Sequence, residues 1–250
     1  ALGIIKVINC HTLKVERSIV GHVNAVNELQ VHPHDKHILL SASKDRSARL
    51  WSLETGRCIA IFAGENGHLD EVLSADFHLS GSMIVTSSMD HTIKVWDITP
   101  ILGKNNEYLK DCHVRTREKV RMPVRYVQFP LLSTSKVHNN YVDCVRFLGD
   151  LVLSKSVENC ISLWAGKYPD KIKTTRMPNH SIRVLGEFRP SQCDVWYIRF
   201  CLDYRRKQVA VGNRGGCVFV WDIDNGRDKA PIKMSNGTFD AAIRQVAFSY

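Results

Sequence analysis

The sequence predicts an all-β fold in which one short four-stranded sheet is repeated along the chain. Residues 21–56 (GHVNAVNELQVHPHDKHILLSASKDRSARLWSLETG) contain three runs rich in Val, Leu, Ile, Ala and Trp, and a fourth run, CIAIFAG, follows. Turn-forming segments separate these runs, which is typical of antiparallel strands rather than of a helix. Because one sheet of this size cannot bury both of its faces, further copies are expected.

Three further copies are present, and they end at Trp96, Trp164 and Trp221, as the first ends at Trp51. Gly-His or His opens the first three copies, and Trp-Asp closes the second and the fourth. A turn residue stands six positions before each tryptophan: Asp45, Asp90, Glu158 and Gly215. A GH…WD pattern with a unit of about 40–45 residues, lengthened here by insertions, predicts a WD40 β-propeller.

The repeat residues are expected to serve the scaffold. Within a blade, the histidine, a strand serine, the turn acid and the tryptophan can form one buried hydrogen-bond network, and unpaired buried polar groups are costly. We therefore interpret these residues as structural rather than catalytic or metal-binding. The predicted networks are His22, Ser43, Asp45 and Trp51 in the first copy, and His68, Ser88, Asp90 and Trp96 in the second.

The first and last residues look like parts of incomplete blades. Residues 3–9 (GIIKVIN) align with TIKVWD of the second copy, with Ile8 in the tryptophan position, and AAIRQVAFSY at 241–250 resembles a first strand. We therefore expect a single WD40 propeller domain over residues 1–250, truncated at both ends. It would hold about four complete blades and partial blades at each end, and the full protein would have seven. Open propellers leave unpaired strand edges, which natural proteins avoid.

Two inter-strand insertions are predicted, at residues 100–137 and 165–185, with the first expected to add a strand and a loop outside the propeller. Residues 21–66 and 67–99 are expected to form compact blades, and residues 224–240 a polar linker. Much of the net charge of +9 lies in three basic segments, 114–121, 167–176 and 204–207. A solvated surface and contact with nucleic acid or a nucleosome both remain open interpretations.

Composition and motifs argue against several other classes. The chain has no run of 18 apolar residues, so no membrane span or membrane partner is expected. The eight cysteines show no CxxC or metal-ligand spacing, which predicts no metal, no cofactor and a reducing compartment. No nucleophile–base pair, carboxylate dyad or phosphate loop is apparent, so an enzyme is not expected.

Candidate binding residues come from aligning the first strands by their aliphatic pairs, because function in propellers usually lies on loops at one rim. The alignment matches Val195 and Ile198 with Val26 and Leu29. The residue after the first of each pair should face the central opening: Asn27, Leu73, Asp143, Trp196 and Arg244. Two further sets should lie nearby, namely Ala25, Glu71, Tyr141, Asp194 and Ala242, and Lys44, Met89, Val157 and Arg214.

Trp196 and Tyr197 are unusual for such a rim, since an apolar core does not require two adjacent aromatic side chains there. Aromatic faces attract cations and can hold a quaternary ammonium group, as in methyl-lysine cages. The alternative is that one ring packs between blades and the other covers the rim. The residue pattern alone leaves both interpretations open.

Several segments resemble one family more closely than a generic WD40 repeat does. They are VGHVNAVNELQVHP, NGHLDEVLSADF, SMDHTIKVWDI, NNYVDCVRFLGDLVLSKSVEN, QCDVWYIRF and AAIRQVAFS, and the likeness covers most of residues 3–250. They resemble the embryonic ectoderm development/extra sex combs family, the WD40 subunits of Polycomb repressive complex 2. The resemblance implies a nuclear, non-catalytic, seven-bladed scaffold with no cofactor.

The resemblance also implies partners. In this family one face reads trimethyl-lysine on the histone H3 tail, and the other holds a helical segment of the SET-domain methyltransferase subunit, which the mark then stimulates. By resemblance, Trp196 and Tyr197 are cage aromatics. The pocket-lining residues implied in the same way are Asn27, Lys44, Glu71, Met89, Tyr141, Asp143, Arg199 and Arg244.

Some residues depart from the family pattern. The family's other two cage aromatics, a Phe and a Tyr, come from a blade that would precede Ala1. Leu69 and Val157 stand where relatives carry Arg and Cys. The alternative function is therefore a WD40 adaptor that holds the methyltransferase and other complex subunits without reading methyl-lysine.

Overall fold

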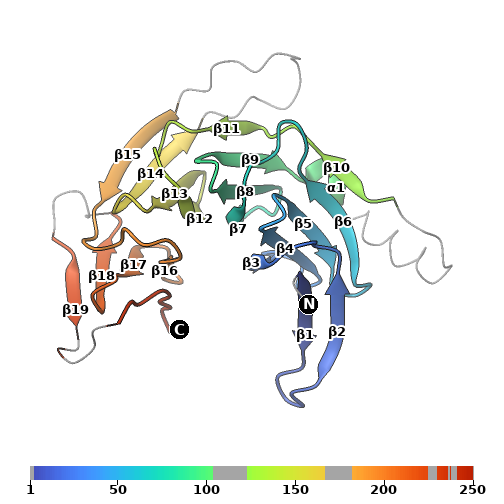
Figure 1. The fold of residues 1–250 in the computed structure, drawn as a ribbon, viewed down its shortest axis with the longest axis horizontal. Coiled ribbons are helices and arrows are strands. Elements are labelled where there is room, and N and C mark those ends of the chain that lie inside the picture. The colour runs from blue at the N-terminus through green and yellow to red at the C-terminus, as the bar shows by residue number, and fades with distance from the viewer. Residues whose placement is uncertain are drawn as a thin grey trace. The chain divides into compact units, whose positions relative to one another are not determined.

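The computed structural model describes residues 3–103, 123–166, 182–224, 230–235, 237 and 241–249. Within these ranges it contains nineteen strands and one short helix. The chain divides into two compact units, residues 1–133 and residues 134–250. Figure 1 shows the strands of each unit, and each unit is described by itself below.

Unit 1 begins with a two-stranded sheet and continues with a sheet in the order β10-β6-β5-β4-β3. The pairs within β3 to β6 are antiparallel, whereas β10 adds to β6 in parallel. The first insertion thus contributes a strand, β10, which extends this sheet at its β6 edge rather than lying outside it. The strands are β1 (Ile4–Ile8), β2 (Val15–Val20), β3 (Val26–Val31), β4 (Ile38–Ser43), β5 (Ala48–Ser52), β6 (Arg57–Phe62) and β10 (Arg125–Val127).

The next sheet has the order β11-β9-β8-β7, and the short helix α1 (Thr99–Leu102) follows β9. The expectation that residues 67–99 complete this blade is wrong, because its fourth strand, β11, follows the insertion. The insertion therefore interrupts the second copy, and its predicted end at residue 137 is too late. The strands are β7 (Val72–Phe77), β8 (Met83–Ser88), β9 (Ile93–Asp97) and β11 (Leu132–Thr134).

Unit 2 holds two antiparallel four-stranded sheets, β12-β13-β14-β15 and β16-β17-β18-β19. We refer to four sheets, with the segments that lead into them, as the first to fourth copies. They are the sheet of β3 to β6 with β10, the sheet of β7, β8, β9 and β11, the sheet of β12 to β15 and the sheet of β16 to β19. The strands of unit 2 are β12 (Val142–Leu148), β13 (Leu151–Ser156), β14 (Cys160–Gly166), β15 (Ile182–Phe188), β16 (Phe200–Leu202), β17 (Gln208–Gly212), β18 (Cys217–Asp222) and β19 (Ile232–Ser235).

Three boundaries in unit 2 differ from the prediction. Strand β14 extends to Gly166 and β15 begins at Ile182, so the insertion is narrower than 165–185. Strand β19 lies in the segment predicted as a polar linker, because its residues complete the sheet by pairing with β18. Residues 241–249 form no regular strand, although the Ile243 amide donates to the Asn213 carbonyl at 2.9 Å.

Each unit has its own apolar core between consecutive sheets. In unit 1 the core includes Phe62 and Trp96, whose ring centroids are 5.5 Å apart. In unit 2 it includes Phe200, Val211 and Trp221. The repeat tryptophans Trp51, Trp96 and Trp164 are at most 1% exposed, which confirms their structural role.

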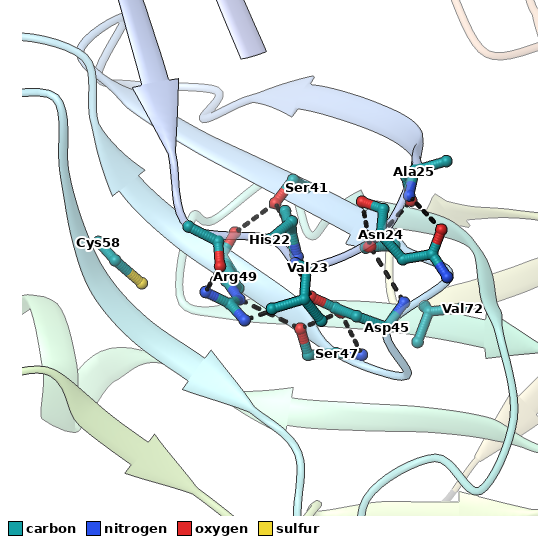
Figure 2. A network of polar contacts seen from close by, with 12 residues as sticks. His22, Val23, Asn24, Ala25, Ser41, Asp45, Ser47, Arg49, Cys58 and Val72 are labelled. Atoms are coloured by element: carbon teal, nitrogen blue, oxygen red, sulfur yellow. Dashed lines mark hydrogen bonds and ion pairs between the residues drawn. The ribbon is translucent and has the colours of Figure 1, made fainter. Parts of the chain in front are cut away.

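The predicted hydrogen-bond network of the first copy is present, with one correction, and Figure 2 shows its members His22, Ser41 and Asp45. His22 contacts Asp45 through Nδ1 at 2.7 Å and Ser41 Oγ through Nε2 at 2.6 Å, and Trp51 Nε1 donates to Ser41 Oγ at 2.8 Å. The hydroxyl is therefore that of Ser41 rather than Ser43. Leu39 pairs with Trp51, so Ser41 is the next residue of β4 on the same face, whereas Ser43 lies two residues further.

The second and third copies use the same position. Thr86, rather than the predicted Ser88, contacts His68 Nε2 at 2.8 Å and accepts from Trp96 Nε1 at 3.0 Å. Ser154 makes the corresponding contacts with His138 and Trp164, at 2.7 and 3.0 Å.

Ser43 and Ser88 instead close the turn at the strand end. Each donates to a backbone carbonyl of the preceding loop and accepts the amide of the turn aspartate at 3.1 Å.

Burial and hydrogen bonding set the charges in these networks. Burial opposes ionisation of Asp45, but hydrogen bonds from His22, Ser47 and the Val23 amide outweigh it and hold the pKa of Asp45 well below its usual range. Burial lowers the pKa of His68, and it lowers that of His138 to about 4. His68 and His138 are therefore neutral at pH 7, which suits a buried network.

Candidate ligand-binding site

The first strands of three copies share a β-bulge at the predicted rim. Their pairing registers skip one residue between Val26 and Glu28, between Val72 and Ser74, and between Val142 and Cys144. A bulge leaves its extra residue out of the ladder and can redirect its side chain. The extra residues are Asn27, Leu73 and Asp143, three of the five predicted to face an opening.

Two of these bulge residues, Asn27 and Asp143, contact the next copy along the chain. Asn27 Nδ2 donates to the Val72 carbonyl at 2.8 Å, so it links β3 to β7. Leu73 and Asp143 are each 1% exposed. The expectation that all three face an opening is therefore wrong for Leu73 and Asp143 as the structure describes them, because both side chains are packed.

The fourth copy replaces the bulge with a longer excursion. The Arg214 amide donates to the Gln192 carbonyl at 2.9 Å. In the first and second copies the equivalent hydrogen bonds run from the Lys44 amide to the Ala25 carbonyl and from the Met89 amide to the Glu71 carbonyl. Gln192, not Asp194, therefore matches Ala25 and Glu71. By strand pairing, Phe200 of the fourth copy corresponds to Ala75 of the second copy, and Cys193, the residue after Gln192, corresponds to Val72. Only Leu73 and Ser74 lie between the two positions in the second copy, whereas residues 194–199 lie between them in the fourth.

The alignment of Val195 and Ile198 with Val26 and Leu29 is consequently wrong. Residues 194–199 form no regular strand, and β16 begins only at Phe200. The two aliphatic residues have the spacing of a first strand, which concealed the inserted turn. The doublet nevertheless emerges at the point in the repeat where the other copies have their bulges.

The two aromatic side chains of this turn lie edge to face. The ring centroids of Trp196 and Tyr197 are 5.1 Å apart with an interplanar angle of 75°. Trp196 is 40% exposed and Tyr197 is half-buried. Tyr197 has a φ of 70°, a left-handed conformation that is uncommon for residues other than glycine. The indole of this edge-to-face pair is therefore open to solvent in part, and the phenol ring less so.

Two arginines support the doublet. The guanidinium carbon of the buried Arg199 lies 5.0 Å from the Tyr197 ring centroid, so it covers one face of that ring. Arg244 Nη1 donates to the Trp196 carbonyl at 3.2 Å, and the Arg199 amide donates to the Arg244 carbonyl at 2.9 Å.

A buried ion pair adjoins the turn. Lys155 Nζ lies 3.0 Å from both carboxylate oxygens of Asp143, and the two residues are at most 1% exposed. Burial raises the pKa of Asp143, while Lys155, Arg199 and a hydrogen bond from the Ile198 amide act in the opposite direction. Sequence reasoning missed Lys155. Its signal was a lysine within LSKS, an otherwise buried strand segment.

The remaining candidates fall in both units. In unit 1, Lys44 Nζ lies 3.3 Å from Glu71 Oε2, and the Met89 amide donates to the Glu71 carbonyl at 3.0 Å. In unit 2, Tyr141 is 39% exposed. The structure thus joins Asp143, Trp196, Tyr197, Arg199 and Arg244 in one group, and Lys44, Glu71 and Met89 in another. Their role as pocket-lining residues stays a prediction.

Metal binding and thiol reactivity are two further kinds of chemistry that the described residues could offer. In these ranges no group of three or more His, Cys, Asp or Glu side chains could hold a metal ion, and no helix is long and apolar enough to cross a membrane. Burial raises the pKa of Cys58 and of Cys193 to about 11, so these thiols stay protonated at pH 7.

The nucleic-acid interpretation concerns three basic segments, of which one lies among the described residues. The basic segments 114–121 and 167–176 lie outside the described residues. In the third, 204–207, Arg206 Nη1 donates to the Phe147 carbonyl at 2.8 Å, so at least this arginine supports the fold.

Comparison with known proteins agrees with this architecture. The family "WD domain, G-beta repeat" matches residues 13–52 and 56–97, segments that end just after Trp51 and Trp96. The chain is 42% identical to Polycomb group protein FIE1 of Oryza sativa subsp. japonica, over 99% of this chain and 64% of that protein. It is 37% identical to Polycomb protein esc of Drosophila melanogaster, over 99% of this chain and 59% of that protein.

Solved structures give the same result. A chain in the crystal structure of the Chaetomium thermophilum polycomb repressive complex 2 matches with a TM-score of 0.71 and 27% identity, over 89% of this chain and 50% of that chain. A chain in the structure of ctPRC2 in complex with H3K27me3 and H3K27M matches with the same TM-score and identity, over 89% and 50%.

The repeated sheets, their Trp-centred networks and these matches define a WD40-repeat protein built from β-propeller blades. Within this class, the chain is similar over nearly its whole length to Polycomb group proteins, in line with the resemblance to the embryonic ectoderm development/extra sex combs family that the sequence indicates. The chain spans less than two thirds of the length of these relatives.

Proposed function

We propose that this protein is a non-catalytic, nuclear subunit of a Polycomb histone methyltransferase complex that reads trimethyl-lysine on the histone H3 tail. In this proposal Trp196 and Tyr197 supply part of an aromatic cage, and the propeller also holds a helical segment of the SET-domain methyltransferase. Reading the mark stimulates that subunit and so maintains gene silencing. The likeness to Polycomb group proteins and to chains of polycomb repressive complex 2 supports the scaffold role.

The observation that carries the reader role is the exposed, perpendicular pair of rings. An aromatic face attracts a cation by about 0.5–2 kcal/mol, and the gain is largest when the cation is already poorly hydrated. A trimethylammonium group meets this condition because it has no N–H to leave unsatisfied. Two rings at 75° can contact such a group on two sides at once.

The local charges suit a weakly hydrated cation rather than a bare ammonium. Arg199 covers one face of Tyr197 and is balanced in part by Asp143. An ordinary lysine ammonium would lose strong hydration beside these arginines and gain no hydrogen-bond acceptor from the rings. The proposed site should therefore discriminate by methylation.

The test is equilibrium binding of the full-length natural protein to histone H3 peptides that differ only in trimethylation of one lysine. We expect the trimethylated peptide to bind more tightly. Trp196→Ala and Tyr197→Ala should each weaken its binding by about 2- to 30-fold, the equivalent of one cation–π contact. Binding of the methyltransferase subunit should be unchanged in both variants.

Tyr204→Ala is the matched control. Tyr204 is an aromatic residue of the same unit that is 81% exposed and lies outside the proposed site. Its loss should leave peptide affinity unchanged. Equal affinity of the parent protein for trimethylated and unmodified peptides would remove the reader role and leave the adaptor role.

A further inference from the structure

We propose that Asp143 is the positioning residue of the Trp196–Tyr197 turn, acting as a buried carboxylate that holds the turn from the neighbouring sheet. The consequence for peptide binding rests on the proposed reader function, but the positioning of the turn does not. This role differs from the pocket-lining role that the sequence implied for Asp143.

The turn needs an external restraint because its backbone is strained. The left-handed conformation of Tyr197 is strained for a residue other than glycine and persists only where the surroundings impose it. The next residue, the fully buried Ile198, donates its amide to Asp143. The carboxylate therefore holds the peptide that immediately follows the strained residue.

Asp143 can do this because of where its sheet places it. It is the extra residue of the β12 bulge, so its side chain is not part of the alternating faces of the strand. Lys155 pairs with Cys144 across β12 and β13 and brings its ammonium to both carboxylate oxygens. A hydrogen bond to a charged group is stronger than one to a neutral acceptor.

The same carboxylate also acts on the rings through Arg199. The charge of Arg199 interacts with Asp143, and its guanidinium stacks on Tyr197. One buried group thus restrains the turn at its backbone and at one ring face. Both restraints lie within unit 2.

The other bulges give an internal comparison. At the same position Asn27 links to the Val72 carbonyl of the next sheet, and Leu73 is apolar. Asn27 faces a sheet whose first strand, β7, follows without an inserted turn. Asp143 faces the inserted turn, and it is the member of this set that is charged and paired with a lysine.

The proposal is tested with two double variants of the full-length protein that remove the buried charge pair together, because a lone buried charge would itself destabilise the fold. Asp143→Ala with Lys155→Met removes the acceptor for the Ile198 amide. Asp143→Asn with Lys155→Met retains an oxygen that can accept it. Both variants lack the ion pair, so a difference between them reports the hydrogen bond from the Ile198 amide alone.

The readout is ¹⁹F NMR of protein labelled with 5-fluorotryptophan, with the Trp196 signal assigned through Trp196→Phe. In the alanine double variant we expect the Trp196 signal to shift or broaden while those of Trp51, Trp96, Trp164 and Trp221 stay in place. The asparagine double variant should restore it. Affinity for the trimethylated peptide should fall at least about 10-fold in the first variant and recover in the second.

Glu28→Gln serves as the control for loss of a buried carboxylate. Glu28 accepts the Ala75 amide at 3.1 Å and so links β3 to β7 in the same manner, within unit 1. Its Trp196 signal should match that of the parent protein. An unchanged Trp196 signal in the alanine double variant would overturn the proposal.

A measurement on the parent protein guards against variants that fail to fold. The amide hydrogen of Ile198 should exchange slowly with solvent, as expected for a donor to a buried carboxylate. Exchange at the rate of an open peptide would overturn the positioning role. If the parent protein showed no preference for the trimethylated peptide, the reader function alone would fail, because neither the ¹⁹F signal nor the exchange rate depends on ligand.

Discussion

The first and fourth copies differ in how they hold the repeat tryptophan and the turn that precedes its strand. In the first, His22, Ser41, Asp45 and Trp51 form a closed network, and the first strand runs on through a one-residue bulge. In the fourth, Val211 stands in the place of Ser41 and Gly215 in that of Asp45. The same copy carries the inserted turn with its exposed aromatic side chains.

The fourth copy keeps its turn closed by another route. The Cys217 amide donates to Asn213 Oδ1 at 2.7 Å, and Asn213 Nδ2 donates to the Ser191 carbonyl at 3.1 Å. An asparagine thus does at this turn what Ser43 does in the first copy. The comparison teaches that a tryptophan in a WD40 sheet can be either a network member that specifies the blade or an apolar residue in a blade specialised for another purpose.

The largest expected effect separates the two kinds of tryptophan. Trp51→Ala should lower the free energy of unfolding by about 3–5 kcal/mol, because it opens a cavity and strips a buried network. Trp196→Ala should lower it by less than about 1 kcal/mol, since the side chain is 40% exposed. Chemical denaturation of the two variants measures both values. Equal losses would mean that Trp196 is a core residue.

A smaller effect should follow from removing one hydroxyl. Thr86→Val keeps the side-chain shape but leaves His68 Nε2 and Trp96 Nε1 without their shared partner, which should cost about 2 kcal/mol. The reciprocal change, Val211→Thr, should also destabilise, by about 1 kcal/mol, because the fourth copy lacks the histidine and the acid. If Val211→Thr stabilised the protein, a hydroxyl at this position would not need the histidine and the acid as partners.

Lowering the pH should destabilise the third copy, which contains His138, more than the fourth copy, which has no such histidine. His138 has an ordinary pKa of 6.5 when unfolded and about 4 when folded, so the unfolded chain binds the proton first as pH falls. Its contribution to stability is complete above pH 6.5 and is lost between pH 6.5 and about 4, at about 1.4 kcal/mol per pH unit.

Stability should therefore fall by about 2 kcal/mol between pH 7 and pH 5 on account of His138. Hydrogen exchange should show lost protection in β12–β15 before β16–β19, whose copy has no such histidine. His138→Gln should flatten this pH dependence. If β16–β19 lost protection first, the histidine would not be the responsible group.

The smallest effect concerns the rim ion pairs that occupy matching positions. Lys44 pairs with Glu71 of the next sheet at 3.3 Å, whereas Arg214 pairs with Asp194 of its own copy at 3.4 Å. Both pairs are partly or largely solvated, so Lys44→Met and Arg214→Met should each change stability by at most about 1 kcal/mol. Denaturation at low and high salt measures the difference, which should disappear at high salt. A larger loss would indicate a structural role for either residue.

Most of the fold was predictable because the repeat states it four times. Each turn residue stands six positions before its tryptophan, and in three copies a histidine precedes that tryptophan by 26 to 29 residues, so each copy corrects the interpretation of the others. The serine of the network was misassigned because LSAS offers two hydroxyls on one face of a strand. Only the pairing of Leu39 with Trp51 decides between them.

The candidate site was less predictable for a related reason. Trp196 and Tyr197 were found because aromatic residues are unusual at a rim, but the inserted turn was hidden by Val195 and Ile198, which imitate a strand. Lys155 was overlooked because a single lysine in a strand looks like a surface residue.

The sequence by itself determined the repeat, the class of fold, the buried tryptophans and the aromatic doublet, because these depend on residue type and spacing along the chain. The tertiary structure alone decided that Asp143 is buried against Lys155, that Ile198 donates to it, and that Arg199 covers Tyr197. These contacts join residues from different strands and sheets. Their charges are balanced only when the folded chain brings them together.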